Sequence, residues 1–267
     1  MSLYDATVRH KAIEKLVMRG TGKAQERKYW RFRVDRWYGG IVTADAVGCG
    51  LLCKFCWVSD RIMMRPAEAG KFYGPETVAN TLVRMAGKKA IRQIRLSGGE
   101  PTIGRDHLLH VLEGLKKQCL LFILETNGIL IGEDKSYAHE LSEFPFVHVR
   151  VSLKGCNEEE FSILTGAKQE GFHTQLKALQ NLVEENVQCH PAVMASFSQE
   201  NSLQRLVERI RAVDPKQAEE LETEELILYP SVQTKLRKNG LSYYRSYMPN
   251  SVPKGTHLAF SSEEWLQ

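Results

Sequence analysis

The sequence has no long apolar run, no stretch of low complexity and no cysteine after Cys189. Its longest apolar run, Cys119 to Leu124, is far shorter than the roughly 20 residues that span a bilayer as a helix, and it predicts a buried strand instead. The first residues contain no uninterrupted apolar segment of the kind found in secretory signal peptides. We therefore expect a cytoplasmic protein that does not enter a membrane.

A large excess of charge of one sign is also missing. The chain has 36 lysines and arginines against 32 aspartates and glutamates, which gives a formal net charge of +4. This mild excess does not require nucleic acid as a partner, although it is compatible with an anionic substrate. In the reducing cytoplasm, the six cysteines are expected to bind a metal or to be buried rather than to form disulfides.

Short β-rich runs alternate with longer helical patterns along the chain. The expected strands are 91–96, 120–125, 147–153, 191–197 and 225–228, after an extended, aromatic-rich stretch at 29–46. The expected helices are 4–18, 75–86, 105–117, 134–141, 174–185 and 202–213, with a short helix capped by Asn157. Repeated strand–helix units predict an α/β fold with parallel strands, and the strands are too few to close an eight-stranded barrel. We therefore expect an open, partial (β/α)6 barrel over residues 29–230. Residues 1–28 are expected to form a helical extension, and residues 231–267 a tail that packs on the barrel or faces a partner.

Three cysteines, Cys49, Cys53 and Cys56, lie close together on a loop that also contains two glycines. Such a loop can fold around one metal centre. A [4Fe–4S] cluster has four irons, so three cysteines would leave one iron open to another molecule. Chance clustering and a zinc site are the alternatives, but no histidine lies between Phe32 and Ala90 to complete a local zinc site.

Polar motifs follow three of the expected strands. They are Ser97, Gly98, Gly99 and Glu100 after the first, Glu125, Thr126 and Asn127 after the second, and Ser152 and Lys154 after the third. Adjacent glycines expose backbone groups to a ligand, and an asparagine side chain both donates and accepts hydrogen bonds. The carboxyl ends of parallel strands form one face of a barrel, so these residues should surround one site. Taken singly, each motif is also compatible with an ordinary turn, and Lys154 with a surface position.

The pattern Cys49-x3-Cys53-x-Phe55-Cys56 resembles the cysteine signature of the radical S-adenosylmethionine (SAM) superfamily, in which an aromatic residue precedes the third cysteine. The resemblance implies a [4Fe–4S] cluster held by these cysteines, with SAM bound at the open iron. In that family the reduced cluster cleaves SAM to a 5′-deoxyadenosyl radical, which abstracts hydrogen from a substrate. A cluster that is open to SAM is also open to oxidants, so activity should be oxygen-sensitive.

The same resemblance assigns roles to the strand-end motifs. It implies that Gly98, Gly99 and Glu100, next to Ser97, hold the amino group of SAM. The motif Glu125-Thr126-Asn127-Gly128 is similar to the family element that contacts the ribose and methionine of SAM. Ser152 and Lys154 resemble a strand end whose lysine meets the SAM carboxylate, and Phe55 and Trp57 are expected to flank the cluster or the adenine.

Residues 157–187 resemble the corresponding region of glycyl-radical-enzyme activating enzymes, with an acidic short helix, a Leu-Thr-Gly turn and an amphipathic helix. The resemblance covers about residues 40–190, and the chain departs from the activase pattern at residues 189–198. It implies a glycine of a protein or peptide as substrate and an electron donor such as flavodoxin or ferredoxin. The alternatives are a radical SAM enzyme that acts on a small molecule, lipid or RNA, and an iron–sulfur electron-transfer or binding protein that makes no radical.

Other features receive structural interpretations. Cys119, Cys156 and Cys189 are widely spaced, so we expect isolated side chains rather than a second cluster. Arg31, Arg33 and Arg36 alternate with aromatic residues, a pattern that is compatible with RNA binding. We favour a half-buried strand whose arginines lie on its solvent-facing side. No nucleic acid partner is therefore expected. His107, His110 and His173 are expected on helix surfaces. The tail tyrosines and Trp265 could pack over the barrel or contact a substrate.

Overall fold

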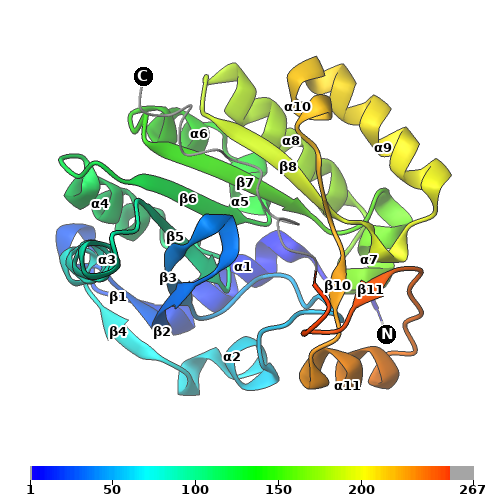
Figure 1. Ribbon diagram of the computed structural model, residues 1–267, viewed down its shortest axis with the longest axis horizontal. Coiled ribbons are helices and arrows are strands. Elements are labelled where there is room, and N and C mark those ends of the chain that lie inside the picture. Colours follow the sequence, from blue (N-terminus) through cyan, green and yellow to red (C-terminus); the bar gives the residue numbers. More distant parts are fainter. Residues whose placement is uncertain (1, 253–267) are drawn as a thin grey trace.

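A computed structural model describes residues 2–252; Met1 and residues 253–267, including Trp265, lie outside the described residues. Six parallel strands form the central part of the main sheet, which curves as Figure 1 shows. In spatial order they are β3 (Ile41–Ala46), β5 (Gln93–Gly98), β6 (Leu121–Thr126), β7 (Val147–Leu153), β8 (Cys189–Met194) and β9 (Glu222–Glu224). Within residues 2–252, β9 does not pair back to the first strands, so the expected open α/β barrel is confirmed.

An antiparallel edge extends this sheet. β2 (Glu26–Asp35) pairs antiparallel with β3, and β1 (Met18–Arg19) and β4 (Lys71–Tyr73) pair antiparallel with β2. The extended stretch at 29–46 is therefore a hairpin rather than one strand. Its turn includes Gly39 and Gly40, whose φ angles of 74° and 121° favour glycine.

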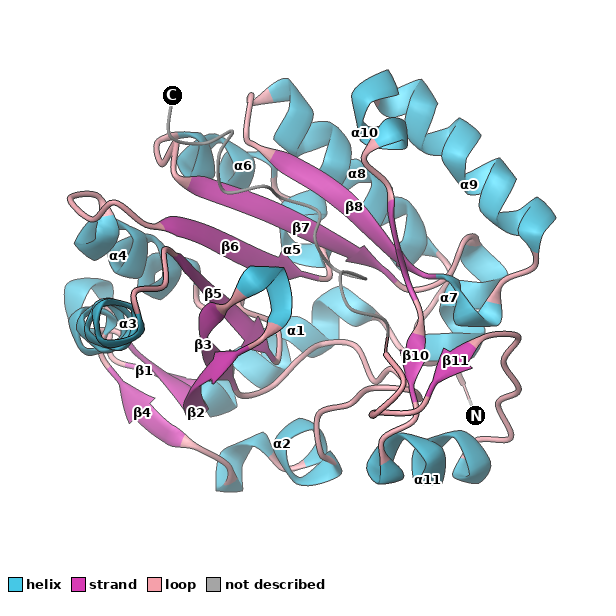
Figure 2. Ribbon diagram, in the orientation of Figure 1, coloured by secondary structure: helices cyan, strands magenta, loops and turns pink. Residues whose placement is uncertain are grey.

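The helices that cover the outer side of the curved sheet include α3 (Pro75–Lys89), α4 (Arg105–Leu115), α6 (Lys135–Ser142), α8 (Glu170–Glu184) and α9 (Glu200–Val213) (Figure 2). The other helices are α1 (Ala6–Val17), α2 (Asp60–Met64), α5 (Ile129–Glu133), α7 (Glu158–Thr165), α10 (Pro215–Glu219) and α11 (Pro230–Lys238). Of these, α2 and α11 lie apart from the sheet, beside the carboxyl ends of its strands. The expected cap of α7 is present, because the Asn157 side chain accepts a hydrogen bond from the backbone N–H of Glu160 at 2.9 Å. Pro75 opens α3, where a missing N–H is tolerated.

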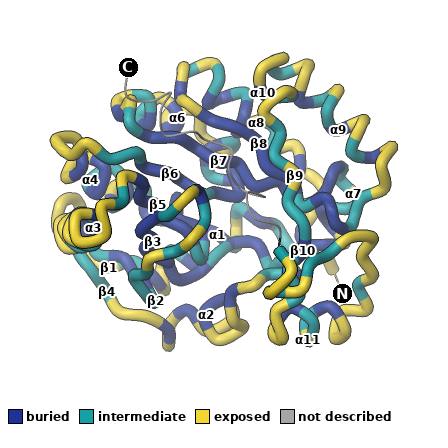
Figure 3. The backbone as a smooth tube through the Cα atoms, viewed as in Figure 1, coloured by how far each residue is buried: buried dark blue, intermediate teal, exposed yellow. Residues whose placement is uncertain are grey.

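The two faces of the sheet differ in character. On the face toward the helices, strand residues such as Ile94, Phe122 and Val149 join α3 and α8 side chains in the main hydrophobic core. Figure 3 shows the central strands as buried and the helices as exposed on their outer sides. The other face carries many polar residues, among them Arg95 and Arg150, beside a small apolar cluster of Tyr38, Ile41 and Ile123. The barrel interior is therefore a polar surface, which the sequence analysis did not predict.

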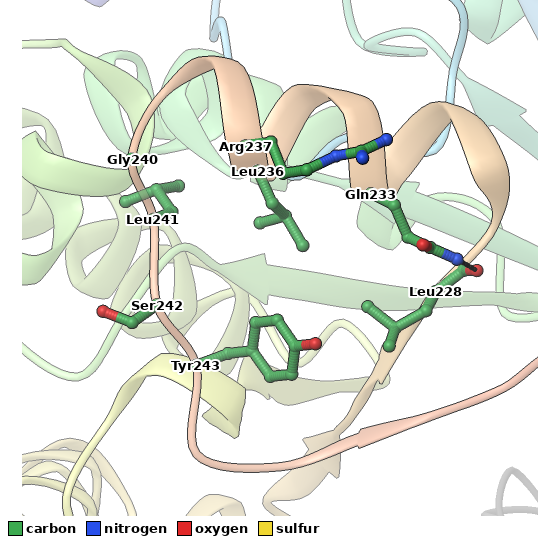
Figure 4. A pocket seen from close by; sticks show the side chains of 8 residues that line it. All are labelled: Leu228, Gln233, Leu236, Arg237, Gly240, Leu241, Ser242 and Tyr243. Atoms are coloured by element: carbon green, nitrogen blue, oxygen red, sulfur yellow. Dashed lines mark hydrogen bonds between the residues drawn. The ribbon is translucent and has the colours of Figure 1, made fainter.

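The chain leaves the sheet after β9. The strand expected at 225–228 is wrong in position, because β9 ends at Glu224 and β10 (Leu226–Ile227) instead pairs in parallel with β11 (Ser246–Tyr247). Helix α11 lies between these two short strands in sequence. A small pocket of about 400 Å³ lies between α11, the loop that follows it and Leu228, which precedes it. Figure 4 shows the side chains that line this pocket. The proposed boundaries at residues 28 and 230 stay a prediction.

Candidate active site

One cavity of about 900 Å³, here called the central cavity, lies at the carboxyl ends of the parallel strands. Its wall contains every residue of the candidate site. These are Cys49, Cys53, Phe55, Cys56, Trp57, Ser97, Gly98, Gly99, Glu100, Glu125, Thr126, Asn127, Ser152 and Lys154. Residues from four separate segments of the chain thus meet on one surface, as the strand-end argument predicts.

The cysteine loop begins where β3 ends and is tied down from several sides. The Leu52 N–H donates to the Tyr4 hydroxyl at 2.8 Å, and the Lys54 N–H donates to the Leu164 carbonyl at 2.9 Å. Burial raises the pKa of the Cys53 thiol to about 12, so the thiols are neutral until a metal displaces the protons. Three thiols facing one cavity suit the cysteine ligation of an iron–sulfur cluster.

Glycines allow the loop to fold closely against its neighbours. A Cβ atom on Gly50 would lie 2.0 Å from Nδ1 of His10, and one on Gly99 would lie 2.2 Å from the carbonyl oxygen of Gly48. Two hydrogen bonds of 2.8 Å join the same segments, from the Gly99 N–H to the Ala46 carbonyl and from the Glu100 N–H to the Gly48 carbonyl. The Gly99 turn and the cysteine loop therefore form one continuous cradle around the three thiols.

The Glu100 carboxylate is buried and accepts four hydrogen bonds from the protein. Its Oε1 accepts from the N–H and the hydroxyl of Thr102 and from the hydroxyl of Thr126, and its Oε2 accepts from the Asn127 N–H at 2.8 Å. A carboxylate has about four acceptor positions, so this side chain is fully engaged. It locks the ends of β5 and β6 together, and its proposed contact with the SAM amino group stays a prediction.

The Glu125 carboxylate is held by two side chains of β5 and by one from the turn between β2 and β3. It accepts hydrogen bonds from Tyr38 at 3.0 Å, Arg95 at 2.7 Å and Ser97 at 2.6 Å. Burial alone would raise its pKa, but the charges of Arg95 and Arg150 and these hydrogen bonds lower the pKa to about 2. Glu125 is thus a permanent anion in the cavity wall.

Asn127 connects the cysteine loop to helix α1. Its Nδ2 donates to Nε2 of His10 at 3.2 Å and lies 3.5 Å from Sγ of Cys49. The other ring nitrogen of His10 donates to the Ala6 carbonyl at 2.7 Å, which fixes the tautomer that accepts from Asn127. The sequence analysis missed His10, because only the tertiary fold brings α1 under the cysteine loop.

Ser152 and Lys154 lie at the end of β7, where the lysine ammonium donates to the serine hydroxyl. The buried Gln175 of α8 supports this strand end. Its amide donates to the carbonyls of Asn127 at 2.6 Å and Ser152 at 3.0 Å, and its oxygen accepts from the Lys154 N–H at 3.2 Å. Gln175 was also missed, since a helical glutamine carries no local signal of such a role.

The two aromatic residues of the loop differ in their surroundings. Phe55 is buried and packs against Phe197, with ring centroids 5.1 Å apart. Trp57 is 42% exposed, and its ring lies 6.4 Å from that of Trp30. Both line the central cavity, but their expected position beside the cluster or the adenine stays a prediction.

Arginines and carboxylates alternate across the rest of the cavity wall. The fully buried Asp45 binds Arg31 and Arg33 of β2. Arg95 binds Asp35 at 3.0 Å, and Arg150 binds Glu222 at 2.8 Å and Glu224 at 2.9 Å. Arg31 and Arg33 of β2 therefore line the cavity rather than an outer wet surface. Any molecule that enters this space meets a charged and strongly hydrogen-bonding wall.

The remaining cysteines and histidines are distributed as follows. Cys119 is exposed, whereas Cys156 and Cys189 are buried, and none of the three lines the central cavity. The expectation of a surface position is wrong for His107, which is fully buried and hydrogen-bonded to Tyr29 at 3.1 Å. Within residues 2–252, no helix has the length and apolar character needed to cross a membrane.

A model of the radical SAM superfamily matches residues 45–210. The chain belongs to the radical SAM superfamily. Radical SAM enzymes use a [4Fe–4S] cluster and SAM and need an electron donor. The thiols and glycine cradle described above fit such a cluster.

Several curated proteins are similar to part of the chain. A protein of Methanosarcina acetivorans named probable GTP 3′,8-cyclase is 30% identical over 165 residues, which is 60% of this chain and 47% of that protein. A protein of Methanococcus maripaludis with the same name is 31% identical over 118 residues, or 44% of this chain and 37% of that protein. The chain thus spans less than half the length of these relatives.

Solved structures of other proteins share the fold. Streptococcus suis SuiB bound to the precursor peptide SuiA matches with a TM-score of 0.54 and 20% identity, covering 65% of this chain and 36% of SuiB. TYW1 with a lysine-pyruvate adduct matches with a TM-score of 0.50 and 16% identity, covering 74% of this chain and 72% of TYW1. At these identities the likeness shows the radical SAM fold alone.

Proposed function

We propose that this radical SAM enzyme binds its cluster through Cys49, Cys53 and Cys56 and acts on a small polar molecule in the central cavity. One observation carries the proposal: the three thiols and all the polar strand ends line the same cavity. An iron–sulfur protein that only transfers electrons has no need for such a cavity beside its cluster.

Each strand end has a task in this proposal. The exposed backbone of Gly98 and Gly99 binds the SAM amino group, Asn127 binds the ribose, and Lys154 binds the carboxylate. When bound, the reduced cluster and SAM supply the radical that abstracts hydrogen from the substrate. Flavodoxin or ferredoxin is the proposed electron donor. The hydrogen bonds that Gln175 and Glu100 make hold these groups in place before SAM enters, which lowers the ordering cost of binding.

The charged wall of the cavity favours a polar substrate. Arg31 and Arg33 keep part of their side chains exposed on this wall, and a lipid chain would remove their water without offering new partners, which is costly. The similar proteins named GTP 3′,8-cyclase act, by their name, on a small molecule. The charged wall thus disfavours a lipid, and the names of the similar proteins favour a small molecule over the protein glycine implied by the activase resemblance.

The first experiment tests for radical SAM chemistry. The protein is reconstituted with iron and sulfide without oxygen, reduced with dithionite and given SAM, and 5′-deoxyadenosine is measured by mass spectrometry. We expect 5′-deoxyadenosine from the wild type and none from Cys53→Ala. A cluster that forms but neither binds nor cleaves SAM would instead support the electron-transfer alternative.

The second experiment tests the substrate class. The reduced enzyme is given GTP, guanosine, other nucleotides and a glycine-containing peptide in separate reactions, and 5′-deoxyadenosine is compared with the substrate-free rate. Stimulation by a small polar compound, with deuterium transferred from a labelled substrate to 5′-deoxyadenosine, is the expected result. Stimulation by the peptide alone would overturn the proposal and restore the activase interpretation.

A further inference from the structure

Lys235 of α11 reaches the cysteine loop across 179 residues of sequence. Its Nζ donates to the carbonyl of Cys56 at 2.9 Å and to the carbonyl of Val58 at 2.5 Å, and it lies 3.1 Å from the carboxylate of Asp60. Three oxygen atoms around one ammonium satisfy all three of its donors. Figure 1 shows α11 beside α2 and the loop that precedes it.

Apolar packing keeps this ammonium in place. Val232 and Leu236, on either side of Lys235 in α11, join Phe55 and Leu164 in a separate buried cluster. Phe55 lies directly before Cys56, so the same helix holds both the side chains and the carbonyls of the loop. The Lys235 side chain is 11% exposed, and so it is shielded from the solvent that weakens surface charges.

Two opposite charges lie beside the backbone of Cys56. The Lys235 ammonium donates to the Cys56 carbonyl, and the Asp60 carboxylate lies 3.1 Å from that ammonium. Charges this close act on an electron added to a cluster at Cys56, because the reduced cluster is more negative than the oxidised one. A nearby cation stabilises the reduced state, and a nearby carboxylate destabilises it.

We propose that Lys235 is a positioning residue that holds the cysteine loop by its carbonyls and makes the cluster easier to reduce. The inference rests on the proposed cluster at Cys49, Cys53 and Cys56. It gives a function to the segment after the barrel, which lies outside the cysteine motif. In this proposal α11 supplies a fixed cation beside the cysteine loop, which is far away in the sequence. Lys235 touches no substrate in this proposal.

The test measures the midpoint potential of the reconstituted full chain by redox titration with electron paramagnetic resonance of the reduced cluster. Lys235→Met removes the charge and the hydrogen bonds, Lys235→Arg keeps a cation, and Asp60→Asn removes the opposing charge while Lys235 keeps its carbonyl partners. Lys238→Met is the matched control, because Lys238 lies in the last turn of the same helix and is exposed. Circular dichroism and iron content are recorded for each variant.

We expect a more negative potential in Lys235→Met, a more positive one in Asp60→Asn, and values near the wild type in Lys235→Arg and Lys238→Met. If Lys235→Met binds no iron, retention of iron by Lys235→Arg supports the positioning role. Unchanged potentials in Lys235→Met and Asp60→Asn, or shifts of the same sign in both, would overturn the inference. Failure of the wild type to hold a [4Fe–4S] cluster would instead overturn the proposed function.

Discussion

Replacing Gly99 by alanine tests whether the cysteine loop and the end of β5 must approach as closely as the structure shows. The new Cβ would lie 2.2 Å from the carbonyl oxygen of Gly48 and 2.9 Å from that of Ala46. Both neighbours are backbone atoms, so no side-chain rotation relieves the overlap. Gly99 is not among the residues with a positive φ, which leaves steric overlap as the main effect.

The cost follows from this geometry. Non-bonded carbon contacts are optimal near roughly 3.5 Å, so the two segments must separate by about 1 Å. That movement weakens the hydrogen bonds from the Gly99 and Glu100 N–H groups, each contributing about 1 kcal/mol, and overpacking adds roughly 1–3 kcal/mol. We expect Gly99→Ala to lower the free energy of unfolding by about 3 kcal/mol. SAM affinity should also fall, because the displaced turn carries the proposed site for its amino group.

Urea unfolding of the metal-free protein measures the first effect, and SAM binding to the reconstituted protein measures the second. Gly87→Ala is the matched control, since Gly87 lies in the last turn of α3 and a Cβ there would have no neighbour within 4 Å. Alanine at that position should raise stability by about 0.5–1 kcal/mol. Wild-type stability and SAM affinity in Gly99→Ala would refute the close-contact argument.

Three further predictions concern the cavity wall and a helix end. Burial would raise the pKa of Glu125, but Arg95 and Arg150 outweigh this effect and lower the pKa from a usual 4.5 to about 2 in the folded protein. The ionised carboxylate therefore contributes roughly 3 kcal/mol to the free energy of unfolding. This contribution is fully present above pH 4.5 and is lost as the pH falls through about 2. Unfolding measured over this pH range should show a smaller loss in Glu125→Gln, and an equal loss would contradict the assignment. Lys154→Met should weaken SAM binding, measured by calorimetry, by about 10–100-fold, because one charge-assisted hydrogen bond is lost. The iron content should not change. Equal SAM affinity in the variant and the wild type would show that Lys154 is not part of the SAM site. Ala90 ends α3 with a φ of 52°, in the left-handed region that favours glycine. Ala90→Gly should therefore raise the free energy of unfolding by about 1 kcal/mol without affecting the cluster. A lower stability of the variant in urea would show that the helix end is not strained.

Local sequence was sufficient to predict which residues meet in the central cavity. The cysteine spacing, the paired glycines at 98 and 99 and the polar residues that end β6 and β7 are short motifs, and each lies directly after a strand with a clear apolar pattern. In a barrel of parallel strands, topology alone brings such strand ends to one face. That is why the open α/β barrel and the membership of every candidate residue in one cavity could be anticipated.

The tertiary structure decided which residues support that site and what the cavity is like. His10, Gln175 and Lys235 come from helices distant in sequence from the loops they contact, and helical periodicity reports only that a position is on a face, not what lies opposite. The charged interior of the barrel could not be predicted for a related reason. Arg95 and Arg150 are polar residues within apolar strand patterns, and such residues indicate that the strand has a second face. They do not indicate whether that face meets solvent or a cavity. Pairing partners of this kind are long-range contacts, and only the folded chain brings them together.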